Sequence, residues 1–436
     1  MKLSIITMTN FFRNILLLSC LAGSVEGVAQ STTSSPYSQF GLGLIKGSQL
    51  PESRSMAGLA AGLRKPSVYS NVNIANPASY SSLRITTFDV GVFAGLGELS
   101  TGSVSENTFD ASLNHLIFGM PVTKTSALSF GLLPYSTKGY NYSRTGTVGG
   151  EEVNYVNSAT GGISKAYLGY GIKLGKRLSV GANASYLFGK LSESQAAEYD
   201  DFSFLNSRTQ INESVSGFNF DYGIQYETPV SKRVNLILGY TGSSDSKINL
   251  RSNNLTTRYY TDATSGVGGV AVDTTQFIQN PKSNIQLPLM HTLGFVLQRN
   301  NKWLVGADVT MGQWENFRKG NVNPGLQNSM GIAVGSQITP DITAVGSYFK
   351  LVDYRFGFKY DKTHINLNNQ DVNEMGITLG LGLPLPANRS TFYKINLGTE
   401  LGQRGSLKNG QIRERFVNIF LSFTMNDQWF QKYKFD

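Results

Sequence analysis

Apolar and polar side chains alternate with a period of two in segment after segment along this 436-residue chain. In 218–226, for example, one set of alternate positions is apolar or aromatic and the other is polar or glycine. Successive side chains of a β-strand point to opposite faces, so each such segment predicts a strand with one apolar and one polar face. The pattern predicts fourteen strands, near residues 86–98, 112–121, 126–136, 163–174, 178–190, 215–228, 233–244, 288–299, 302–312, 328–338, 342–358, 373–383, 392–403 and 413–425.

The connections between these segments alternate in length. Short connections fall at 121–125, 175–177, 229–232, 300–301, 339–341 and 384–391, and longer polar ones at 137–162, 191–214, 245–287 and 313–327. Transmembrane barrels have short periplasmic turns and longer extracellular loops. With both termini in the periplasm, every short connection falls on the periplasmic side. A soluble β-sandwich or propeller, the alternative fold, has no reason to keep this rhythm.

A lipid environment explains why the strands should close on themselves. A bilayer offers the backbone no hydrogen-bond partners, so a sheet can cross it only as a closed barrel. The apolar rows would then face lipid, and the rows of glycine and polar residues would face the lumen. The predicted fold class is therefore all-β, a transmembrane antiparallel β-barrel of fourteen strands over residues 86–425, followed by a C-terminal periplasmic tail, 426–436.

Residues 1–29 predict an export signal, because a basic start and a short apolar stretch precede the small residues Gly27-Val28-Ala29. The single cysteine, Cys20, lies inside this segment. An alternative is a lipobox ending at Cys20, which would lipidate the chain. In either case disulfides and cysteine-based catalysis are excluded from the barrel. The net charge of +9 is spread without a basic run, so no nucleic-acid partner is expected.

Residues 30–85 lack strand alternation and are rich in small residues. Fourteen strands enclose a lumen wider than side chains can fill, and such pores are either wet or plugged. The segment contains apolar residues that favour burial, so we expect it to form a plug with a turn at Asn76, Pro77 and Ala78. The alternative is a flexible periplasmic leader.

Several motifs together resemble the FadL-like outer-membrane transport proteins, in the branch found in Bacteroidota-type bacteria. The matching runs are Ser55 to Gly58, Asn76-Pro77-Ala78, His115 to Pro121, Phe130 to Tyr140, Lys165 to Leu174 and Phe423 to Phe430. The resemblance implies a fourteen-stranded barrel with an N-terminal hatch. It also implies sideways release of hydrophobic ligands through a kinked third strand, which would correspond to Pro134, Tyr135 and Ser136. Proline removes a ladder hydrogen bond and bends a strand, although Pro134 could also simply end its strand at the outer rim.

No catalytic or cofactor motif accompanies this pattern. The chain has no phosphate-binding loop, zinc-protease motif or nucleophile elbow, and its three histidines fall in separate segments. We therefore expect a protein that is not an enzyme and that needs no cofactor or metal.

Two functions remain open. The first is passive uptake of small hydrophobic compounds, of the long-chain fatty acid or hydrocarbon type, through a plugged lumen in the outer membrane. The second is a non-transporting accessory subunit of an outer-membrane secretion or barrel-assembly complex, since FadL-like barrels of this branch also serve as subunits. Lipid and hydrophobic small molecules are the expected partners of the first, and other outer-membrane proteins those of the second. A transporter needs an apolar pocket between hatch and wall, whereas a subunit needs apolar patches on its loops or on one lipid-facing side.

Overall fold

The computed structural model describes residues 34–428, apart from 66–68, 103, 202, 262–267, 387–390 and 409. The predicted signal segment 1–29, with its cleavage site and Cys20, lies outside the described residues, as does most of the predicted tail. Within the described part of the chain, no helix combines the length and apolar character of a membrane-spanning helix.

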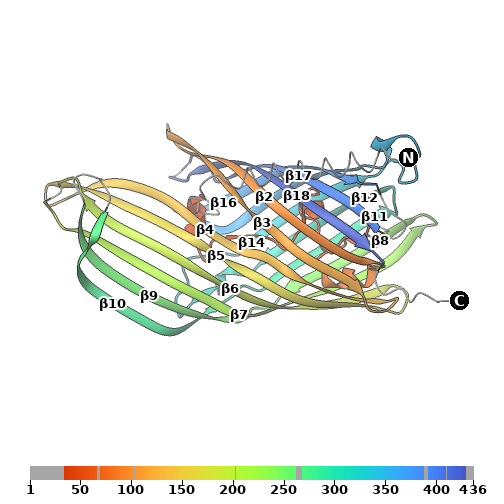
Figure 1. The fold of residues 1–436 in the computed structure, drawn as a ribbon, viewed down its shortest axis with the longest axis horizontal. Coiled ribbons are helices and arrows are strands. Elements are labelled where there is room, and N and C mark those ends of the chain that lie inside the picture. Colours follow the sequence, from red (N-terminus) through yellow and green to blue (C-terminus); the bar gives the residue numbers. More distant parts are fainter. Residues whose placement is uncertain are drawn as a thin grey trace, which may run out of the picture. The chain divides into compact units, whose positions relative to one another are not determined.

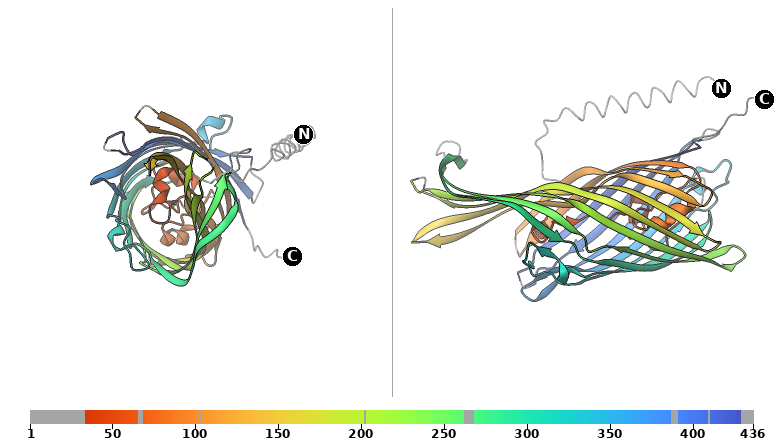
Figure 2. Two further views of the ribbon diagram at one scale, coloured as in Figure 1. Left: turned by 90° about the vertical axis from the view of Figure 1, so that its left-hand side faces the viewer. Right: turned by 90° about the horizontal axis from the view of Figure 1, so that it is seen from below.

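Fourteen antiparallel strands close into one ring, which Figure 2 shows end-on. The ring is closed by pairing of the last strand with the first, from Arg413↔Ser100 to Asp427↔Thr86. Its strands are β2 (Thr86–Thr101), β3 (Val104–Pro121), β4 (Ser126–Val148), β5 (Glu151–Leu174), β6 (Leu178–Tyr199), β7 (Asn206–Ser231), β8 (Val234–Ser243), β11 (Met290–Arg299), β12 (Trp303–Gly312), β14 (Ser329–Ile338), β15 (Asp353–Leu367), β16 (Gln370–Pro384), β17 (Thr391–Arg404) and β18 (Arg413–Asp427).

The two faces of the ring differ as the alternation predicts. On β7, Phe218 and Phe220 are 60% and 52% exposed on the outside, whereas Asn219 between them is buried in the lumen. Outward rows of large apolar side chains recur on other strands, including Leu293 on β11 and Phe356 on β15. Exposed apolar side chains in continuous rows are unfavourable in water and favourable against acyl chains. The predicted fold class is confirmed.

Five connections differ from the prediction. The expected loops 137–162 and 191–214 are largely strand, because β4 runs on to Val148, β5 starts at Glu151, β6 runs on to Tyr199 and β7 starts at Asn206. The expected loop 245–287 is largely a long hairpin of β9 (Lys247–Thr261) and β10 (Gly268–Gln286). The predicted strand 342–358 starts only at Asp353, so the short connection 339–341 is in fact a turn of 339–352 that contains the 3-10 helix η4 (Tyr348–Lys350). The loop 313–327 carries the 3-10 helix η3 (Trp314–Asn316) and the two-residue β13 (Arg318–Lys319).

The segment from residue 34 to the first barrel strand forms the predicted plug, here called the hatch. It contains η1 (Pro36–Gln39), β1 (Leu44–Ile45), α2 (Pro51–Arg54) and η2 (Pro77–Ser82), and Figure 2 shows it inside the ring. Its apolar side chains Met56, Leu59 and Tyr80 are fully buried. Met56 and Leu59 pack with Val296 and Leu304 of the wall. In its described part the hatch has no hydrophobic core of its own, so burial of its apolar side chains against the wall stabilises it inside the lumen.

Candidate functional site

The turn Asn76-Pro77-Ala78 lies deep in the lumen. The Asn76 side chain accepts a hydrogen bond from the Ala78 backbone N–H at 3.1 Å, which caps η2, and it donates to the Ala61 carbonyl at 2.6 Å. Two wall glycines make room for the turn. A Cβ on Gly223 would lie 2.0 Å from Asn76 Oδ1, and one on Gly181 would lie 2.5 Å from the Pro77 carbonyl group. The wall thus touches the hatch backbone directly at this point.

A buried ion-pair network joins the hatch to the wall. Lys65 of the hatch lies 3.1 Å from Asp353 of β15 and 3.4 Å from Glu52 of α2. Asp353 also forms ion pairs with Arg355 at 3.1 Å and with Lys394 at 2.7 Å, and Arg355 lies 3.6 Å from Glu52. The side chains of the five are at most 14% exposed. Three cations and two carboxylates therefore share one largely dehydrated cluster.

The charges in this cluster stabilise one another. Burial alone would raise the pKa of Glu52, but the neighbouring Lys65, Arg355 and Lys394 outweigh it, so its pKa lies below the usual range. Burial likewise opposes the charged form of Lys65, but Asp353 and Glu52 raise its pKa. Both hatch groups are therefore ionised at neutral pH. Removing one partner would leave the others buried and under-compensated.

The wall is incomplete between β3 and β4. These strands pair only from Leu116↔Leu132 to Pro121↔Ala127, and the distal part of β3 pairs only with β2 among the described residues. The hatch covers the edge of β4 that is left free. Its strand β1 pairs with Ser136 and Thr137, and the Lys46 backbone N–H donates to the Tyr135 carbonyl at 2.8 Å. We call this break the β3–β4 seam.

The predicted wall-kink residues Pro134, Tyr135 and Ser136 lie where the seam begins. The ladder between β4 and β5 shifts register between Pro134 and Ser136, which is a bulge. The strand does not end at Pro134, since β4 continues to Val148. The proline therefore stands at a bend inside a long strand, next to the point at which β3 and β4 separate.

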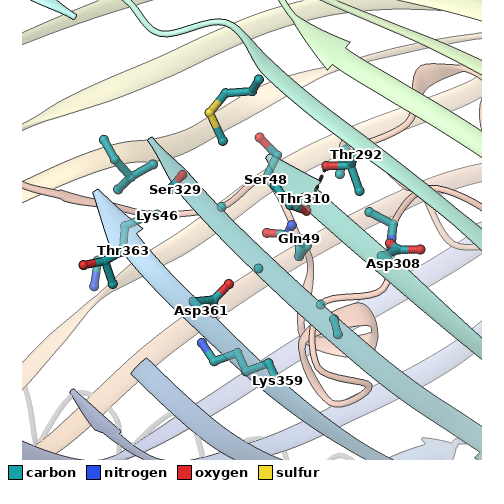
Figure 3. A pocket seen from close by; sticks show the side chains of 18 of the residues that line it. Lys46, Ser48, Gln49, Thr292, Asp308, Thr310, Ser329, Lys359, Asp361 and Thr363 are labelled. Carbon is teal, nitrogen blue, oxygen red and sulfur yellow. Dashed lines mark hydrogen bonds between the residues drawn. The ribbon is translucent and has the colours of Figure 1, made fainter. Parts of the chain in front are cut away.

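A cavity of about 470 Å³ lies between the hatch and the wall (Figure 3). Its charged lining comprises six basic and five acidic residues: Lys46, Arg54, Lys165, Lys359, Lys362, Arg404, Asp221, Asp308, Asp361, Glu374 and Glu400. Sequence reasoning placed Asp221, Asp308 and Glu400 in lumen-facing rows and Lys46 and Arg54 in the plug, and it did not find that these groups gather around one space. Apolar side chains also line the cavity, so its surface is mixed and is not continuously apolar. They include Ile45, Ile74, Tyr135, Met290, Trp314 and Ile332.

Beyond the closed ring, the sheet continues on one side as an extension that we call the wing. It consists of the distal halves of β4, β5, β6 and β7 together with β9 and β10, at the end opposite the short turns (Figure 1). Strand β10 forms the outer edge of the wing. Among the described residues it pairs only with β9, except that its last two positions also pair with β13. Val270, Val272 and Phe277 of β10 are 90%, 63% and 62% exposed. The wing thus ends in an open edge strand with uncovered apolar side chains.

The three histidines lie in separate parts of the barrel. His115 pairs with Asp89, His291 bonds Tyr240, and His364 stacks on Trp314, so the fold keeps them apart. No group of three or more metal-ligating side chains occurs among the described residues.

Comparison with known proteins gives one family and one fold. A family model described as BamG matches residues 11–436. No curated protein matches in sequence. Among solved structures, a Pseudomonas aeruginosa FadL homologue is 12% identical with a TM-score of 0.61, covering 88% of this chain and 99% of its own. The P. putida toluene transporter TodX is 14% identical (TM-score 0.57; 89% and 99% covered), and the CymD monoaromatic hydrocarbon channel is 10% identical (TM-score 0.55; 90% and 100% covered). The fold is thus that of the FadL-type barrels.

Proposed function

The chain belongs to the BamG family, and on that premise we propose that it is a non-transporting accessory subunit of an outer-membrane protein secretion or barrel-assembly complex in a Bacteroidota-type bacterium. Both termini would lie in the periplasm, and the wing would stand on the extracellular side, because outer-membrane barrels have their short turns in the periplasm. The observation that carries the proposal is the wing, whose apolar edge strand lies open beyond the membrane-facing part of the barrel.

The edge of β10 has the features of a protein-binding strand. Residues 270–279 are exposed on both faces and include only one charged residue, Asp273. A long edge strand with few charges offers unpaired backbone groups to a second polypeptide, and natural proteins usually cover or charge such an edge. We expect the partner to contribute an extended segment that adds to β10, with its side chains against Val272 and Phe277.

The lumen supports the same proposal. The buried network around Asp353 holds the hatch to the wall, and the cavity beside the hatch is lined with charges. An apolar ligand gains about 0.8 kcal/mol per methylene only where it leaves water for an apolar environment. In this cavity, whose lining mixes apolar and ionic side chains, part of the ligand would displace water from ionic groups, which opposes binding.

Passive uptake of small hydrophobic compounds is the second candidate function. Solved neighbours are described as a toluene transporter and a hydrocarbon channel, and the β3–β4 seam favours a sideways exit at Pro134, Tyr135 and Ser136. In that mechanism, the turn Asn76-Pro77-Ala78 would anchor the hatch while β1 moved away from the edge of β4. The ligand would pass directly into the bilayer and would not be rehydrated on the way.

One experiment separates the two functions. The tagged chain is extracted from native membranes in mild detergent, and its stoichiometric partners are identified by mass spectrometry, for the native protein and for Val272→Asp. A matched control is Val230→Asp, since Val230 is 62% exposed at the opposite end of the barrel. We expect a defined partner that Val272→Asp releases and Val230→Asp retains.

The opposite pattern identifies a transporter. If the chain is recovered without partners and its deletion strain loses uptake of toluene or oleate, the accessory role is wrong. If toluene and oleate enter the deletion strain at the normal rate, uptake is excluded as the main function.

A further inference from the structure

The two ends of the barrel differ in charge. The turns that join strands at the end opposite the wing (Figure 1) hold seven basic residues and one acidic residue, Asp341, among the described residues. The basic residues, here called the basic rim, are Lys124, Lys176, Arg177, Lys232, Arg233, Lys302 and Lys350. The described connections at the other end hold four acidic and three basic residues, namely Asp200, Asp201, Asp245, Glu315, Arg318, Lys319 and Lys408. The sequence contains no basic run, and it is the fold that brings these cations to one end.

The cations of the basic rim are available to a ligand. All except Lys302 are exposed, and in the described part of the chain none of these six has a carboxylate within ion-pair distance. Lys302 lies 3.7 Å from Asp341, and the two side chains are 40% and 43% exposed. Like charges gathered at one end of a protein repel one another and attract anions. The rim therefore favours an anionic partner.

The rim begins where the lipid-facing surface ends. Leu174 and Leu178, which enclose the β5–β6 turn, are 47% and 36% exposed on the outside. Within this turn, the guanidinium group of Arg177 donates a hydrogen bond to the hydroxyl group of Tyr226, in the outward apolar row of β7, at 3.3 Å. Exposed apolar side chains also stand beside other turns of this end: Val122, Val230 and Ile338. Aromatic side chains of transmembrane barrels mark the interface between acyl chains and headgroups, so Arg177 stands at the depth of the headgroups.

We propose that the basic rim binds anionic phospholipid headgroups of the leaflet that surrounds these turns. In the orientation given above, this is the periplasmic leaflet. The phosphate oxygens of the lipids would accept charge-assisted hydrogen bonds from the lysine and arginine side chains, while the acyl chains of the same lipids contact the outward leucines and valines. Clusters of basic residues just beyond a membrane-spanning segment select anionic lipids in this way.

The distribution of the rim around the barrel favours a lipid layer over a docked protein. Its cations come from five successive turns of the ring, which join β3 to β4, β5 to β6, β7 to β8, β11 to β12 and β14 to β15. A protein that docks on one side would contact only part of this arc, whereas headgroups surround every turn. The rim and the wing lie at opposite ends, so the proposal goes beyond the accessory role and does not depend on it.

The test uses the purified full chain in bilayers of phosphatidylcholine that contain a small fraction of spin-labelled lipid. Electron paramagnetic resonance measures how much labelled lipid the barrel immobilises, which gives the association constant of phosphatidylglycerol relative to phosphatidylcholine. At low salt we expect phosphatidylglycerol to associate roughly twofold more strongly or better. This preference should disappear in about 1 M sodium chloride, where the Debye length falls to about 3 Å.

Two variants of equal charge show where the preference originates. The rim variant combines Lys176→Gln, Arg177→Gln, Lys232→Gln and Arg233→Gln, and we expect its relative association constant to fall close to one. The wing variant removes four exposed cations far from the rim, by Arg144→Gln, Arg251→Gln, Arg258→Gln and Lys282→Gln, and should keep the native preference. Heat-modifiable gel mobility checks that both variants fold.

Several results would overturn the proposal. They are a relative association constant near one for the native chain, a preference that persists in high salt, and an equal loss of preference in the rim and wing variants. If the rim variant keeps the lipid preference but loses a protein from the native-membrane extract, the rim binds an acidic protein and the lipid proposal is wrong. The accessory role is measured separately, with Val272→Asp, so either proposal can fail without the other.

Discussion

The pair of Lys65 and Asp353 provides a quantitative test of how firmly the hatch is held. Asp353→Asn leaves Lys65, Arg355 and Lys394 buried with only Glu52 to compensate them. Removing one partner of a buried ion pair typically costs about 3–5 kcal/mol. Lys65→Met is milder, because Asp353 keeps two cations, and the loss should be that of one charged hydrogen bond, about 1.5–3 kcal/mol.

The coupling free energy between the two substitutions isolates their contact. Each single variant loses the Lys65–Asp353 interaction, so the sum of the two single losses counts it twice, whereas the double variant loses it once. We therefore expect a coupling free energy of about 2 kcal/mol, within the range for residues in direct contact. The measurement is equilibrium unfolding in guanidinium chloride, in phosphocholine vesicles, for the native chain, both single variants and the double variant. Limited proteolysis of the hatch in the native barrel reports whether the loss is local.

A surface pair in the same chain serves as the control cycle. Lys302 and Asp341 lie 3.7 Å apart, and their side chains are 40% and 43% exposed. Exposed pairs are screened by water and typically contribute at most about 1 kcal/mol. If the Lys65–Asp353 coupling is no larger than that of Lys302–Asp341, the network does not hold the hatch, and the argument against a mobile plug fails.

Three further outcomes follow from the geometry. Gly181→Val places a side chain against the Pro77 backbone, and overpacking should cost about 1–3 kcal/mol of unfolding free energy and make the hatch protease-sensitive, whereas Ser105→Val, at an exposed position of β3, should not. Because the pKa of Glu52 is depressed in the folded state, its contribution is present above its ordinary value of 4.5 and is lost as pH falls below it, so proteolysis of the hatch should accelerate only under acid conditions. Replacing 254–278 with Asn-Gly, between the paired Asn253 and Gln279, should leave the barrel folded by heat-modifiable gel mobility but release the wing's partner, and a barrel that fails to fold would show that the wing is structurally essential.

The strand pattern was predictable where lipid lies outside and water inside. On β7, alternation identified Phe218 and Phe220 as outward and Asn219 as inward because each face has its own solvent. Past the bilayer both faces of a strand meet water, so β9 and β10 keep their backbone pairing without an alternating sequence, and the segment was interpreted as a loop. The reverse error occurred at 342–352, where apolar residues such as Val345 and Phe349 alternate but lie exposed in a turn.

The site was less predictable than the barrel, for a physical reason. Local sequence shows that Asp353 faces the lumen, but its partner Lys65 is 288 positions away, and no local spacing links them. The same holds for Asp308 and the N–H groups of Ala60 and Ala61, which meet only when the hatch enters the ring. Of the residues at the site, only the wall glycines beside the Asn76 turn, Gly181 and Gly223, could be recognised in the sequence, as small residues in lumen-facing rows.

The hatch and the wing together favour a barrel that acts mainly through its outer surfaces. A transport route for apolar ligands needs a hatch that moves and a path that stays apolar. Here the hatch closes the β3–β4 seam through β1 and is tied to the wall at Asp353, so opening the seam from inside would require moving a segment held by buried charges. The proposed partner site on the wing carries no such cost, because among the described residues the outer edge of β10 is unpaired up to its last two positions. A partner bound there, as proposed above, would leave the ring and its hatch unchanged, as a stable subunit of a membrane complex requires.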